Sequence, residues 1–118
     1  MHDWTRAGLN AHIAVSATKS ATTDTLLSAI RPNAYIAGLD VRDCVLHWPI
    51  HESARRRLGV RHPVTGKLGV YLFLPPGLSA APAINEECMD RITEVATRGM
   101  PLFVARTSMT FAWSTPLS

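Results

Sequence analysis

The residues best placed to do chemistry are two histidines that flank a tryptophan near the middle of the chain. His47 and His51 are four positions apart, and Trp48 lies between them. An aromatic wall beside a titratable imidazole is a common arrangement in ligand pockets. We therefore predict a small-molecule site at His47, Trp48 and His51, in a binding protein or an enzyme of the paired α+β barrel type.

A metal ion is a different possible ligand for the same two histidines. On one face of a helix, an H-x-x-x-H spacing brings both imidazoles to one ion. Pro49 lies between them, and its ring disrupts a helix that runs through the pair. On a strand, positions four apart are separated by about 13 Å, too far to share an ion. The sequence therefore predicts no metal site and no cofactor.

The second chemical feature is a basic segment. Five of the twelve basic residues fall within thirteen positions: Arg55, Arg56, Arg57, Arg61 and Lys67. Such a segment can bind phosphates with an affinity that falls as salt rises. It contains no Phe, Tyr or Trp to stack on bases, and the net charge is only +3. We therefore predict that Arg55, Arg57 and Arg61 face a protein partner, and nucleic-acid binding through residues 55–67 is the third alternative.

Catalytic constellations are scarce in this sequence. Cys44 and His47 are three residues apart, so on an extended segment their side chains point to opposite faces. Cys88 falls in the apolar stripe of an expected helix and is predicted to be a small buried hydrophobe. The chain has no GxSxG, P-loop, GxGxxG or HExxH motif. These observations favour a protein that is not an enzyme.

The elements that must position these residues alternate between strand and helix. Strands are predicted at 9–17, 34–41, 44–48 and 103–113, a hairpin at 58–74, and helices at 24–31, 50–57 and after Asn85. The segment 50–57 also fits a strand, because its residues alternate as well as they follow a helical period. Without the hairpin, the order is a βαββαβ skeleton. We predict one α+β domain over residues 1–118, with a mostly antiparallel sheet of the split-βαβ, ferredoxin-like kind.

Three segments carry the clearest local signals. Gly66 ends a Pro-Val-Thr-Gly turn, where a positive φ is needed to reverse the chain. Asn85 is predicted to cap the last helix, whose core stripe would be Cys88, Ile92 and Val95. From Phe103 to Trp113 the residues alternate, with Phe103, Met109, Phe111 and Trp113 on one face of a single long strand.

The composition indicates that copies of the chain associate. Charged residues make up 18% of the sequence, against about 25% in soluble domains generally. Few charges on a small chain leave apolar surface that a partner subunit can cover. The leading hypothesis is therefore a non-catalytic, self-associating binding or assembly module, with Phe111 and Trp113 in its interface.

Cysteine usage and the N-terminal sequence predict a cytoplasmic location. The two cysteines are far apart and have no CxxC spacing, so no disulfide framework is expected. The first residues lack the basic start and apolar stretch of a secretory signal. No run of about 18 apolar residues occurs, so a membrane partner is not expected. Arginine outnumbers lysine ten to two, a bias that we associate with GC-rich bacterial coding.

Overall fold

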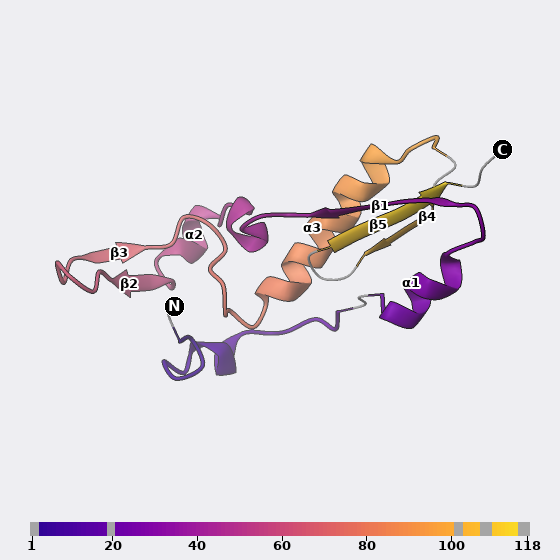
Figure 1. Cartoon of the computed structure of the whole chain (residues 1–118). Coiled ribbons are helices and arrows are strands. Elements are labelled where there is room, and N and C mark those ends of the chain that lie inside the picture. Colours follow the sequence, from indigo (N-terminus) through magenta and orange to yellow (C-terminus); the bar gives the residue numbers. More distant parts are fainter. Residues whose placement is uncertain (1–2, 19–20, 101–102, 107–109, 116–118) are drawn as a thin grey trace. The chain divides into compact units, whose positions relative to one another are not determined.

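The computed structural model describes residues 3–18, 21–100, 103–106 and 110–115. Helices and strands are mixed, with a three-stranded and a two-stranded antiparallel sheet, so the α+β class is confirmed (Figure 1). The chain divides into two compact units. Unit 1 comprises Met1–Ser16 and Asp43–Ala83, and unit 2 comprises Ala17–Arg42 and Ile84–Ser118. One domain over residues 1–118 stays a prediction.

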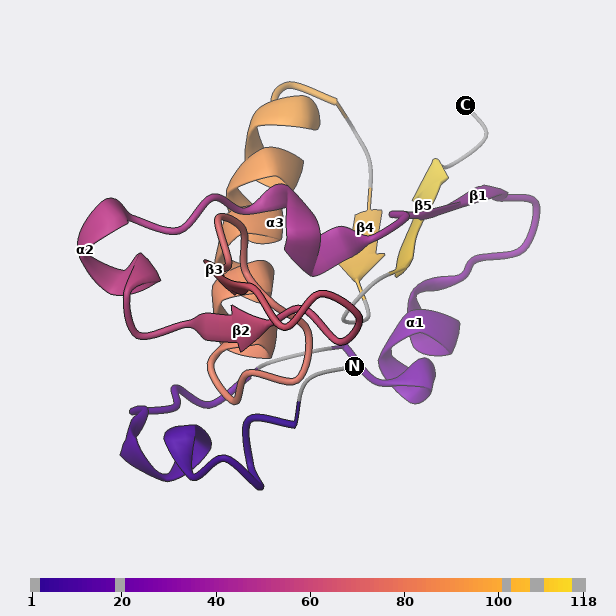
Figure 2. The ribbon, with the colours of Figure 1, turned by 90° about the vertical axis from the view of Figure 1, so that its left-hand side faces the viewer.

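The predicted hairpin is present in unit 1. Strands β2 (Gly59–Arg61) and β3 (Leu68–Val70) pair in antiparallel register, and the helix α2 (Glu52–Arg55) leads directly into β2 (Figure 2). Gly66 has a φ of 68°, as the turn prediction requires. The His62 ring stabilises the turn, since its Nδ1 accepts hydrogen bonds from the backbone N–H groups of Val64 and Thr65, both at 3.2 Å.

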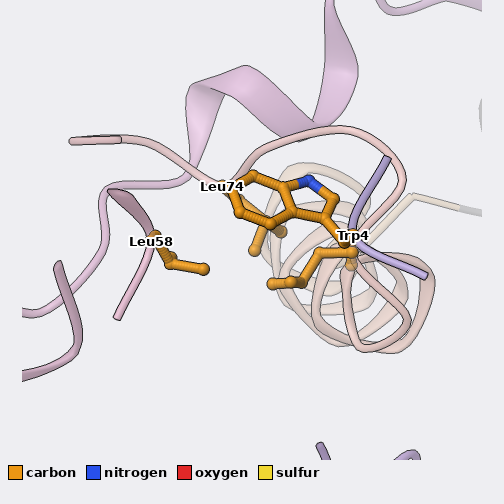
Figure 3. Close-up of a cluster of buried hydrophobic side chains, with 5 residues drawn as sticks. Trp4, Leu58 and Leu74 are labelled. Atoms are coloured by element: carbon orange, nitrogen blue, oxygen red, sulfur yellow. The ribbon is translucent and has the colours of Figure 1, made fainter. Parts of the chain in front are cut away.

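Unit 1 has a tightly buried apolar cluster. Its members are Trp4, Leu58, Leu74, Leu78 and Ala81. Figure 3 shows the side chains of Leu58 and Leu74 around the Trp4 indole. The indole also packs edge-on against the Tyr71 ring at a centroid distance of 5.6 Å, and its Nε1–H donates to the carbonyl of Pro76 at 3.2 Å. Each buried leucine of the cluster contributes about 1.5–3 kcal/mol when it is withdrawn from water.

The strand predicted at 9–17 is wrong. Leu9–His12 is a 3₁₀ helix, η1, and it follows Gly8 in a left-handed conformation. The backbone N–H groups of Leu9 and Asn10 both donate to the carbonyl of Trp4, so the buried tryptophan winds this segment into turns. Asn10 then fixes it: its amide donates to the carbonyl of Gly77 and its Oδ1 accepts from the N–H of Ser79. The alternation that suggested a strand rested partly on alanines, which bury little surface.

The strand predicted at 44–48 is also wrong. Cys44–His47 forms a second 3₁₀ helix, η2, after Asp43 takes a positive φ of 53°. Extended pairing begins only afterwards, in an isolated antiparallel bridge between Pro49 and Phe73. Proline has no N–H to donate to a sheet, so it tolerates such a bridge better than the interior of a ladder.

Unit 2 contains the three-stranded sheet in the order β1-β5-β4. Strand β1 (Tyr35–Asp40) confirms the strand predicted at 34–41, and it pairs antiparallel with β5 (Thr110–Thr115). The single strand predicted at 103–113 is wrong, because β4 (Phe103–Arg106) and β5 are separate strands that pair with each other. Met109 lies outside the described residues.

The first helix of unit 2 lies where the sequence predicts it. Helix α1 (Thr23–Ala29) confirms the helix predicted at 24–31, and Thr22 caps it by accepting the N–H of Thr25 at 3.3 Å.

Helix α3 (Ala81–Ala96) begins four residues before the predicted cap. Asn85 is therefore an interior residue, only 2% exposed, and the stripe predicted at Cys88, Ile92 and Val95 is wrong. Met89 is buried instead, whereas Val95 is 66% exposed.

The finer topology is not confirmed. Among the described residues the first strand of the predicted βαββαβ skeleton is absent, and the last is a hairpin. In the same residues, no helix combines the length and apolar character needed to cross a bilayer.

Candidate functional site

The predicted trio lies on the segment between η2 and α2. His47 is the last residue of η2 and is exposed, and Trp48 follows it at the C-cap. His51 is the N-cap of α2, where its Nδ1 accepts the backbone N–H of Ser53 at 3.3 Å and lies 2.9 Å from the Ser53 hydroxyl. One nitrogen of this imidazole is therefore already engaged in starting a helix.

Trp48 has a structural role that accounts for its burial. It is half-buried and packs against the Trp4 cluster. Its carbonyl accepts the N–H of Leu74 at 2.8 Å, and the N–H of Ile50 donates to the carbonyl of Leu72 at 2.9 Å. These bonds hold the trio's backbone against the segment after β3. The small-molecule site at His47, Trp48 and His51 stays a prediction, and the part of the chain that the structure describes holds no cluster of three or more metal-ligating residues.

The predicted arginine patch lies on α2 and β2, in unit 1. The Nε–H of Arg55 donates to the carbonyl of Ile50 at 2.9 Å, which leaves only its terminal nitrogens for a partner. Arg61 donates from Nη1 to the carbonyl of Gly66 at 3.0 Å. Arg57 is exposed. Two of the three guanidinium groups thus brace the backbone, and their role in binding a partner stays a prediction.

Neither Cys44 nor Cys88 forms a disulfide. Cys44 is buried in unit 1, whereas Cys88 is half-buried in unit 2. Burial, and secondarily the neighbouring Glu87 carboxylate, raises the pKa of the Cys88 thiol. A raised pKa lowers the fraction of thiolate at neutral pH. That Cys88 is not a nucleophile stays a prediction.

The sequence analysis missed the most exposed apolar feature of unit 2. Strand β1 is an edge of its sheet, and Tyr35, Ile36 and Leu39 are 68%, 52% and 56% exposed. An edge strand presents backbone N–H and C=O groups that can pair with another chain. The signal was present in the sequence as five successive uncharged residues, Tyr35 to Leu39, but nothing local tells an edge strand from a central one.

The predicted interface residues Phe111 and Trp113 lie on β5, the central strand of the same sheet. Phe111 is opposite Leu39 of β1 and Arg106 of β4, and Trp113 is opposite Ala37 and Val104. In the observed hairpin, Trp113 is therefore paired with Val104. The predicted single strand instead placed Trp113 on the same face as Phe103. Their membership of an interface stays a prediction.

Comparison with known proteins adds no family to this description. No protein-family model matches the chain, and no curated protein matches it significantly.

Proposed function

We propose that the protein is a self-associating binding module whose copies join along the edge strand β1. The observation that supports this proposal best is the combination of an edge position with exposed apolar side chains at Tyr35, Ile36 and Leu39. Natural edge strands commonly carry lysine or proline, which discourage pairing with another copy. Strand β1 has neither, and its one charge is Asp40, at its end.

Antiparallel pairing of two β1 strands is self-complementary. A two-fold axis at Ala37, perpendicular to the sheet, would place Tyr35 of each copy opposite Leu39 of the other. Cross-strand apolar pairs of this kind contribute about 0.2–1 kcal/mol each, in addition to the backbone hydrogen bonds. Two-fold contacts of one surface with itself are also the commonest way in which proteins form dimers.

The low charged fraction of 18% is the second support for this proposal. It leaves apolar surface that association would remove from water.

The experiment is the mass in solution, by light scattering on a sizing column at several concentrations. We expect the native chain to have twice the monomer mass at high concentration. Ile36→Lys should give the monomer, because it introduces a charge at the centre of the paired edge. Val64→Lys is the matched control, since Val64 is 87% exposed in the hairpin turn of unit 1. A native monomer at every concentration would contradict the proposal.

Binding of a nucleic acid or another polyanion is a second candidate function. The distribution of charge favours it, because unit 1 has six basic and three acidic residues and thus carries the whole net charge of +3. Unit 2 has as many acidic as basic residues. The affinity for single-stranded and duplex DNA should fall steeply from low to high salt. Arg57→Ala should lower this affinity by the same factor whatever the base sequence of the DNA. Affinity that does not change with salt would exclude this function.

We also propose a cytoplasmic location, from the cysteine usage and the N-terminal sequence, and a bacterial origin, from the excess of arginine over lysine. A small-molecule site at His47, Trp48 and His51 is a further proposal. If both histidines are replaced and ligand affinity does not change at pH values where histidine titrates, this site is excluded.

A further inference from the structure

A cavity of about 320 Å³ lies inside unit 2, between α3 and the sheet. Figures 1 and 2 show α3 running beside the strands of this sheet. The described residues that line the cavity are Leu39, Asp40, Val41, Met89, Ile92, Thr93, Ala96, Thr97 and Val104. Its volume falls within the range of about 300–1,000 Å³ that is usual for small-molecule sites. A cavity of about 150 Å³ already holds benzene.

The lining is apolar in character even where the residue types are polar. The hydroxyl of Thr93 donates to the carbonyl of Met89 at 2.8 Å, and the hydroxyl of Thr97 donates to the carbonyl of Thr93 at 2.8 Å. Both hydroxyl protons are therefore committed to the helix backbone. A ligand in the cavity would find few donors from these side chains and would contact mainly methyl, methylene and thioether groups.

Charge also restricts the ligand. Among the described residues that line the cavity, Asp40 is the one with an ionisable side chain, and it is exposed. The nearby helix α3 carries Asp90 and Glu94, and its Arg91 is already paired with Glu94 at 3.4 Å. Since none of the described lining residues is basic, an anionic ligand would leave its charge without a partner in an apolar site.

The lining side chains are accessible. Leu39 is 56% and Ile92 49% exposed, although both are large apolar residues that a closed core would bury. Exposed apolar surface that lines a groove commonly marks a ligand-binding or interaction site.

We propose that this cavity binds an uncharged small molecule with an aromatic or branched hydrocarbon body. Leu39 belongs both to this cavity and to the proposed interface along β1, but Ile36 does not line the cavity, so a substitution of Ile36 tests the interface separately.

The first experiment uses N-phenyl-1-naphthylamine, a neutral apolar fluorophore, as the probe. We expect saturable fluorescence enhancement at one probe per chain. Ala96→Phe should weaken binding at least tenfold, because the added ring occupies the cavity. Val95→Phe is the matched control: it places the same ring one residue away, at a position that is 66% exposed and does not line the cavity. Circular dichroism of both variants shows that α3 and the sheet still form.

The second experiment locates the probe without any cavity-filling substitution. The chain has four methionines, and Met89 lines the cavity whereas Met100 is exposed and does not. In protein labelled with ¹³C at the methionine methyl groups, the ring current of the probe should shift the Met89 resonance and leave that of Met100 in place.

The monomeric Ile36→Lys variant separates the cavity from the interface. Unchanged probe affinity in this variant supports the cavity. The proposal would be overturned by probe binding that disappears with Ile36→Lys, by equal affinity in Ala96→Phe and Val95→Phe, or by an unshifted Met89 resonance in the native chain at saturation.

Discussion

Both units expose apolar side chains, but the buried apolar cluster lies in unit 1. In unit 1, the indole of Trp4 packs against leucines that are less than 8% exposed. In unit 2, the helix and the sheet leave an open cavity, and Tyr35, Ile36 and Leu39 of β1 are more than half exposed. A packed cluster stabilises its own unit, whereas exposed apolar surface gains free energy only when another molecule covers it. The proposals of self-association and of a cavity ligand both concern this exposed apolar surface of unit 2.

The histidines and the net positive charge are concentrated in unit 1. All five histidines and the whole net charge of +3 belong to unit 1. In that unit, His51 caps α2 and His62 caps the hairpin turn, while Arg55 and Arg61 donate to backbone carbonyls. Residue types that usually indicate chemistry thus act here largely as local structural supports. The chemical character of a residue and its exposure have to be judged together.

Trp4→Ala should cause the largest loss of stability. It removes the centre of the unit 1 cluster together with the hydrogen bond to Pro76, so we expect a loss of about 3–5 kcal/mol in the free energy of unfolding. Urea unfolding followed by circular dichroism measures it. The control is Val64→Ala, at an 87% exposed position, which should change stability by less than about 0.5 kcal/mol. Equal losses in both variants would contradict the packed cluster.

Asn10→Ala should have the next largest effect. It removes the amide that joins η1 to residues 77 and 79 and leaves backbone groups without partners, at a cost of about 1–3 kcal/mol. The control is Ser79→Ala, because the Ser79 hydroxyl is buried and has no partner among the described residues. Removing this hydroxyl should leave the free energy of unfolding unchanged or raise it slightly, because the backbone N–H of residue 79 still donates to Asn10. A loss in Ser79→Ala as large as that in Asn10→Ala would argue against this anchor.

Gly66→Ala should destabilise the hairpin by about 1 kcal/mol. A side chain at a φ of 68° is strained although the surrounding space is open. Gly69→Ala is a matched control, because a Cβ there also meets nothing within 4 Å and its φ is not positive. Thermal unfolding should show a lower midpoint for Gly66→Ala alone. If the two variants melt together, the turn geometry described here is incorrect.

The smallest expected effect is that of the Cys88 thiol on the pH dependence of the free energy of unfolding. Because burial raises its pKa in the folded state, the folded chain holds this proton more tightly than the unfolded chain does. Its contribution to stability is therefore fully present below the ordinary pKa of a thiol and is lost as pH rises through the raised value. Cys88→Ser should remove this part of the alkaline loss. The rate at which Cys88 is alkylated, followed against pH, checks the raised pKa independently.

The sequence predicted best the elements whose signals are local. The hairpin depends on Gly66, and β1 depends on a run of strand-forming residues, so both were found. The segment 9–17 was misassigned because its structure depends on Trp4 and on contacts of Asn10 with residues more than sixty positions away. The β4–β5 hairpin was read as one strand because no glycine or proline lies between Phe103 and Thr115.

The candidate sites were harder to predict for a related reason. Residue types alone suggested His47, Trp48 and His51, but only the fold shows that Trp48 packs on a core and that His51 caps a helix. The exposure of β1 and the cavity beside α3 depend on how distant segments pair. No local pattern in the sequence encodes either of them.

The most direct test of the proposed association is hydrogen–deuterium exchange of the β1 amides at protein concentrations above and below the dimer transition. In an antiparallel sheet, alternate N–H groups of Tyr35–Asp40 point away from β5 and toward the open edge. The proposal predicts that these amides become protected at high concentration and that Ile36→Lys abolishes the change. Exchange of these amides that is equally fast at all concentrations would contradict it.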